Sequence, residues 1–108
     1  MKQNLFDLVP KISEHITTEK EEELSVITFP RFRSKFMQKY FVSKRKSPII
    51  RIRLEEHGTA VWDLIDGKRT VKEIADILVE HFQHEKNYEY RVAAYVSQLY
   101  KQGFVKKG

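Results

Sequence analysis

The sequence of 108 residues contains no cysteine, which excludes disulfide bonds, thiolate metal sites and a cysteine nucleophile. The N-terminus lacks the basic, apolar and small-residue pattern of a secretory signal, so we expect a cytoplasmic protein. No apolar run approaches the roughly 20 residues that span a bilayer, and we expect a chain that is soluble or at most attached to a membrane surface. A chain of this length builds one modest core, which predicts a single domain over residues 1–108.

Acidic residues are missing from Arg31 to Leu54, although the net charge of the whole chain is only +5. Aromatic residues recur at helical spacing among the lysines and arginines of this segment. This pattern predicts a basic, partly helical and amphipathic insert over residues 31–47. This surface could hold phosphates, anionic lipid or an acidic peptide, and a merely solvated face is an equally good interpretation. The residues of the candidate basic patch are Arg31, Arg33, Lys35, Lys39, Lys44, Arg45 and Lys46.

Residues 54–78 predict two short helices and the turn between them. Gly67 supplies the left-handed stop that ends the first helix. Thr70 and Glu73 form the T-x-x-E pattern of a capping box, which predicts the start of the second helix. The apolar face of the first helix is Val61, Trp62 and Ile65. The apolar stripe of the second is Val71, Ile74, Ala75, Leu78 and Phe82.

Three segments predict strands. The β-branched residues of 12–18 and 24–29 favour extended chain, with the charged cluster at 19–23 as a turn between them. Residues 49–54 alternate as a third strand. Its expected core face is Ile50, Ile52 and Leu54, and its expected solvent face is Ile49, Arg51 and Arg53.

A third helix is predicted to begin at Asn87 as the N-cap and to end at Gly103. Its apolar stripe is Val92, Tyr95, Val96 and Leu99, whereas Tyr100 lies off the stripe and should be freer. Phe104 and Val105 should pack back on the core. The sequence therefore predicts an α+β domain with a three-stranded antiparallel sheet followed by three helices.

Candidate catalytic residues find no partners in the sequence. The segment at 67–70 resembles the end of a phosphate loop, but Trp62 stands where the loop requires a glycine. His81 and His84 are three residues apart, which is a metal-ligand spacing. The negative end of the helix dipole also favours a partly protonated imidazole near a helix C-terminus, however, so we prefer a structural role for His81. His15 and His57 have no triad partner, and no serine lies in a nucleophile elbow. We expect no catalysis, no cofactor and no metal.

Two segments carry a family resemblance, namely IIRIRLEEHGTAVWDLIDGKRT at 49–70 and RVAAYVSQLYKQGFV at 91–105. They resemble the PqqD family, small proteins related to coenzyme PQQ synthesis protein D. The resemblance covers most of the chain and is weakest over 31–47. It implies a winged-helix-like fold that acts as a peptide chaperone. Such a recognition element binds the leader of a ribosomally made, post-translationally modified peptide and works with a partner such as a radical SAM enzyme.

The resemblance also implies where a peptide would bind. The strand at 49–54 would receive an extended peptide at a sheet edge, and the last helix would form the other wall of the groove. Main-chain pairing would supply affinity, whereas Arg51 and Arg53 would select acidic side chains. The insert at 31–47 would cover or extend the groove. The candidate peptide-binding residues are Ile49, Arg51, Ile52, Arg53, Arg91, Tyr95 and Gln98.

Two other functions stay open. The second and third helices have the order of a helix-turn-helix, which would make the chain a DNA-binding winged helix. Glu89 opposes this hypothesis because it lies near the N-terminus of the would-be recognition helix, and most positive charge precedes Leu54. A basic protein of membrane surfaces, or a structural interaction protein, is the third hypothesis.

Overall fold

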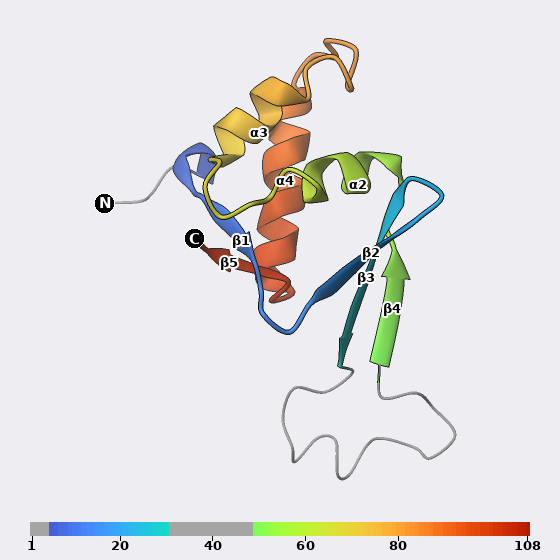
Figure 1. The fold of residues 1–108 in the computed structure, drawn as a ribbon. Helices are drawn as coiled ribbons and strands as arrows, with labels where there is room; N and C mark the ends of the chain where they lie inside the picture. Colours follow the sequence, from blue (N-terminus) through green and yellow to red (C-terminus); the bar gives the residue numbers. More distant parts are fainter. Residues whose placement is uncertain (1–4, 31–48) are drawn as a thin grey trace.

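The computed structural model describes residues 5–30 and 49–108, which form two small sheets and three α-helices (Figure 1). The predicted α+β class, with a three-stranded antiparallel sheet and three helices, is confirmed. The predicted insert and every residue of the basic patch lie outside the described residues. In chain order the elements are η1 (Leu5–Asp7), β1 (Pro10–Ile12), β2 (Thr17–Glu21), β3 (Leu24–Pro30), β4 (Ile49–Arg53), α2 (Glu56–Trp62), α3 (Val71–Ile77), α4 (Tyr88–Lys101) and β5 (Val105–Lys107).

The three-stranded sheet has the order β2-β3-β4 and is antiparallel throughout. It extends away from the three helices, with α2 lying between its upper end and α4 (Figure 1). This position explains why one prediction for β4 is wrong: of the expected core face only Leu54 is buried, whereas Ile52 is 36% exposed. The alternating pattern predicted that one whole face of β4 covers the core, but the strand extends beyond the core and only Leu54 at its end is buried.

The first predicted strand, at 12–18, is also wrong in its placement. The chain turns between Ser13 and Ile16, where the Ile16 N–H donates to the Ser13 carbonyl oxygen at 3.1 Å. Residues before this turn form β1, which pairs antiparallel with β5 from the C-terminal end. Residues after it form β2. A second, two-stranded sheet therefore joins the two ends of the described chain, where only apolar packing by Phe104 and Val105 was expected.

The turn between β2 and β3 is tighter than predicted, because β2 continues to Glu21, which pairs with Leu24. Only Glu22 and Glu23 form the turn, with φ angles of 52° and 72°. Two consecutive left-handed residues match the right-handed twist of a hairpin, but asparagine and glycine adopt this conformation at lower cost than glutamate. The hairpin therefore carries local strain.

The core lies between α2, α3 and α4 and continues onto β3. Trp62, Val71, Ile74 and Val96 are at most 1% exposed. The Trp62 indole Nε1 donates to Thr18 Oγ1 at 3.0 Å, so the buried ring has its polar atom satisfied. The predicted core role of Trp62 is confirmed.

The local signals around the helices are largely confirmed. Gly67 has the predicted left-handed conformation with φ 78°, but it does not end the first helix, because α2 stops at Trp62 with Asp63 as its C-cap. Gly103, after the end of α4, has φ 77°. Glu73 N–H donates to Thr70 Oγ1 at 3.1 Å while Thr70 N–H donates to Glu73 Oε1 at 2.9 Å, which is the predicted capping box. The second helix is shorter than its apolar stripe, however, because α3 ends at Ile77 and Phe82 reaches the core from a turn.

The predicted start of α4 is confirmed, because Asn87 is its N-cap, but the capping contact and the expected freedom of Tyr100 are not. Asn87 precedes the helix in a left-handed conformation with φ 65°, and its side chain makes no capping hydrogen bond. Tyr100 is half-buried rather than free, and its hydroxyl has no hydrogen-bond partner in the described part of the chain. Burial raises the pKa of this hydroxyl, because an ionised phenolate would be poorly solvated there.

We expect the double substitution Glu22→Asn with Glu23→Gly to stabilise the protein by about 1 kcal/mol, because both residues tolerate positive φ. Urea denaturation followed by circular dichroism measures the change. A second double variant, Glu22→Gly with Glu23→Val, places a β-branched residue at positive φ and should destabilise the hairpin. Equal stability of the two variants would contradict a left-handed turn at these residues.

We expect Thr70→Ala to destabilise the protein by about 1 kcal/mol through loss of the α3 cap, and Trp62→Ala by roughly 3–5 kcal/mol through a core cavity. Thr70→Ser keeps the hydroxyl and serves as the control. Thermal unfolding compares the variants. An unchanged melting temperature for Trp62→Ala would show that its ring is not in the core.

Candidate functional site

The outer edge of β4 exposes main-chain hydrogen-bonding groups. Leu54 N–H donates to the Ser25 carbonyl oxygen at 2.8 Å, which sets the alternation of the antiparallel pairing with β3. The main-chain groups of Ile52 therefore face β3, whereas those of Arg51 and Arg53 face outward. Within the described ranges no strand pairs with this edge. Such an edge can receive an extended segment from another chain.

The side chains of Arg51 and Arg53 lie across the sheet face from two acids of β2. Arg51 Nη2 is 3.3 Å from Glu19 Oε2 and 3.2 Å from Glu21 Oε2, and Arg53 Nη2 is 2.8 Å from Glu21 Oε1. All of these side chains remain substantially exposed to solvent. Each pair is therefore worth about 0–1 kcal/mol, so an incoming carboxylate could replace either glutamate at little cost.

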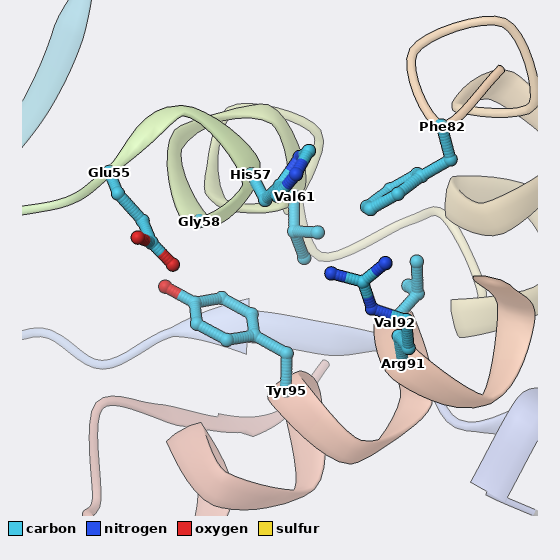
Figure 2. Close-up of a pocket in the computed structure, with 8 residues that line it drawn as sticks. All are labelled: Glu55, His57, Gly58, Val61, Phe82, Arg91, Val92 and Tyr95. Atoms are coloured by element: carbon cyan, nitrogen blue, oxygen red, sulfur yellow. The ribbon is translucent and has the colours of Figure 1, made fainter. Parts of the chain in front are cut away.

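A cavity of about 130 Å³ lies at the end of β4, between α2 and α4 (Figure 2). Val61, Val92 and the Phe82 ring form its apolar walls. Glu55, which follows β4 and its buried neighbour Leu54, lies on one side of the cavity, and Arg91 of α4 lies near Phe82 (Figure 2). The cavity thus offers an apolar interior with one acidic and one basic group beside it.

Gly58 allows Tyr95 to lie close to α2. A Cβ atom at Gly58 would be 2.8 Å from Tyr95 Oη, which is closer than van der Waals contact allows. Figure 2 shows the Tyr95 ring extending from α4 toward Glu55 along this open position. Burial raises the pKa of the Tyr95 hydroxyl, and the negative charge of Glu55 adds to this shift. Tyr95 therefore presents a neutral hydroxyl to the cavity.

Arg91 is held in place by two neighbours. Its guanidinium carbon lies 5.5 Å from the centre of the Phe82 ring, and its Nη1 donates to Glu85 Oε2 at 2.8 Å. A cation over an aromatic face is attracted by the ring quadrupole. The arginine therefore has a defined position beside the cavity while its side chain stays half-exposed.

The structure brings together only some of the predicted peptide-binding residues. Arg91 and Tyr95 line the cavity, whereas Gln98 is exposed further along α4 and does not line it. The other four, Ile49, Arg51, Ile52 and Arg53, lie on β4. Sequence reasoning missed the following cavity residues: Glu55, His57, Gly58, Val61, Phe82 and Val92. The spacing of Gly58 and Val61 on one helical face was a usable signal for two of them, and the predicted apolar stripes that contain Phe82 and Val92 were a signal for two more.

The histidines pair differently from their spacing in the sequence. His84 Nε2 lies 3.1 Å from Glu80 Oε1, and His81 Nε2 lies 2.9 Å from Nδ1 of His57. In the part of the chain that the structure describes, no group of three or more histidine and acidic residues has a geometry that could hold a metal. The sequence spacing of His81 and His84 thus produced no shared site.

The comparisons with known proteins return one finding. The family model of coenzyme PQQ synthesis protein D (PqqD) matches residues 50–105, which run from β4 to the first residue of β5. Neither a curated protein nor a solved structure matches the chain. None of the helices in residues 5–30 and 49–108 is long and apolar enough to cross a membrane.

We expect Gly58→Ala to destabilise the protein by about 1 kcal/mol, because overpacking against Tyr95 Oη outweighs the helix propensity that alanine adds. Introducing Gly58→Ala into a Tyr95→Phe background removes the clashing oxygen and should cost less, or stabilise. Chemical denaturation of the four proteins gives the coupling free energy. Additive effects would show that Tyr95 does not lie against Gly58.

Proposed function

This chain belongs to the PqqD family, and from that premise we propose that it is a non-catalytic peptide-binding module. It recognises the leader of a ribosomally made precursor peptide and presents it to a modifying enzyme such as a radical SAM protein. The family is named for coenzyme PQQ synthesis, and its match includes β4, α2, α3 and α4. The proposal assigns no catalytic residue.

The observation that carries the proposal is the outward-facing main chain of β4 next to an apolar cavity. A leader segment would add a strand along Arg51 and Arg53, and main-chain pairing would supply most of its affinity. The cavity begins where β4 ends, at Leu54 and Glu55. Its volume of about 130 Å³ is close to the roughly 150 Å³ of an engineered apolar cavity that binds benzene. It would therefore accept one apolar side chain of the bound strand.

Selection of acidic side chains by Arg51 and Arg53 is a weaker contribution in this proposal. Both guanidinium groups already contact Glu19 or Glu21 across the sheet face. An acidic leader residue would exchange one exposed ion pair for another, so the net gain is modest. Shape and main-chain pairing would then determine affinity, and charge would tune it.

The DNA-binding hypothesis has less support. Glu89 lies in the first turn of α4, and the charge of Arg91 in the same helix is paired with Glu85. A recognition helix needs its N-terminal part to approach phosphates and base edges. The third hypothesis, a membrane-surface protein, rests on a basic patch that lies outside the described residues.

We expect Arg51→Pro to weaken leader binding about tenfold while the fold survives, because proline removes an N–H that faces outward. Arg51→Ala is the matched control for the side chain and should weaken binding less than about threefold. Ile52→Pro removes an N–H that faces β3 and should disrupt the sheet instead. Isothermal titration with leader peptides encoded beside the gene, together with circular dichroism, measures both effects.

Wild-type affinity for Arg51→Pro with native circular dichroism would contradict strand addition at β4. Amide chemical-shift mapping separates the competing functions. Shifts confined to α4 with duplex DNA, and none with any leader peptide, would replace peptide recognition by DNA binding.

A further inference from the structure

His57 and His81 bring two imidazole nitrogens from separate elements to one place. His57 is the second residue of α2, and His81 lies in the turn that follows α3. His57 Nδ1 and His81 Nε2 are 2.9 Å apart, and the two rings are perpendicular. The Phe82 ring stacks on His57 at 4.9 Å and meets His81 edge-on at 5.0 Å. Both imidazoles are therefore positioned by the same aromatic side chain.

We propose that His57 and His81 bind a divalent transition metal ion of the copper or nickel kind. Two nitrogens that lie 2.0–2.1 Å from one metal at right angles are separated by about 2.9 Å. Right-angled nitrogen ligands are typical of tetragonal copper(II) and nickel(II), whereas tetrahedral zinc separates its ligands by about 3.4 Å. The observed separation thus fits both a shared hydrogen bond and a tetragonal metal.

Metal binding requires a specific tautomer of each ring. His57 must carry its proton on Nε2 and His81 on Nδ1, so that both facing nitrogens offer lone pairs. In the metal-free pair one of the two facing nitrogens carries the hydrogen and donates a hydrogen bond, which the other nitrogen accepts. The metal replaces this hydrogen bond, and the hydrogen moves to the far nitrogen of the same ring.

The surroundings of the two histidines supply negative charge, whereas no third histidine or acidic side chain of the described residues completes a metal-ligand set. A cavity of about 230 Å³ is bounded by both histidines, Gln83 and Glu85, with room for an ion and its water ligands. A second cavity, of about 590 Å³, has His81 and four acids on its walls, namely Glu22, Glu23, Glu55 and Glu56. These carboxylates create a local potential that attracts a cation. Arg91, paired with Glu85, is the opposing charge on the Phe82 side.

A bound metal would link α2 to the turn that follows α3 through the side chains of His57 and His81. His57 and Phe82 also line the cavity between α2 and α4, so the link would fix one wall of that cavity. The turn that carries His81 continues into Gln83 and His84, which have φ angles of 54° and 57°. Metal binding would hold this strained turn against α2.

Titration of the tag-free full chain with Ni²⁺ tests the proposal. We expect one ion per chain by isothermal titration and a melting temperature that rises with Ni²⁺ concentration. His57→Gln and His81→Gln should each weaken binding at least about tenfold. His84→Gln is the matched control, because the His84 imidazole pairs with Glu80 and not with the two proposed ligands, and it should change affinity less than about twofold.

The Cu²⁺ complex gives a second readout. Its electron paramagnetic resonance spectrum should show coupling to two imidazole nitrogens, and to one in either the His57 or the His81 variant. Equal metal-free melting temperatures establish that the variants fold. Absence of Ni²⁺ binding at about 1 mM, or binding that survives in His57→Gln and is lost in His84→Gln, would overturn the assignment.

Discussion

The arrangement of the whole molecule depends on a buried polar junction between β3 and α2. Ser25 is fully buried, its N–H donates to Thr59 Oγ1 at 3.0 Å, and its hydroxyl donates to Asp63 Oδ1 at 2.6 Å. Thr59 in turn donates to the Leu54 carbonyl oxygen at 3.3 Å. A buried polar group without a partner costs about 1–3 kcal/mol. A shift of the sheet relative to α2 would break these hydrogen bonds, so they fix the position of β3 against the helix.

This junction explains how an extended sheet can present a defined edge. The sheet projects from the helices (Figure 1), and the Phe29 ring near its far end packs against Phe104 at a centroid distance of 4.8 Å. Its near end is fixed at Ser25 and Leu54, and the Trp62 indole adds a hydrogen bond to β2. The outward main chain of β4 and the cavity that starts at Glu55 therefore keep a constant relation, which a strand with one anchored side chain requires.

Charges that are separated in the sequence become neighbours in the fold. Arg51 and Arg53 belong to a segment without acids, yet β2 places Glu19 and Glu21 on their face of the sheet. The basic character that the sequence suggested for β4 is thus largely neutralised. For this reason we expect main-chain pairing and the cavity to contribute more to peptide affinity than charge does.

The sequence by itself determined the features that depend on neighbouring residues. The capping box of Thr70 and Glu73, the left-handed Gly67 and the apolar spacing of α4 are set within one or two helical turns. The alternation of 49–54 likewise identified β4, whereas its place at the edge of the sheet follows from the strand order β2-β3-β4.

Only the tertiary structure decided the features that join distant residues. The pairing of β1 with β5 and the contact of His57 with His81 have no local pattern. The apolar stripe predicted that Phe82 is buried, but only the fold shows that it reaches the core from a turn. The exposure of Ile52 belongs with them, because alternation defines two faces of a strand but not how far the core extends beneath it. Burial depends on which elements cover a residue, and that is a property of the assembled fold.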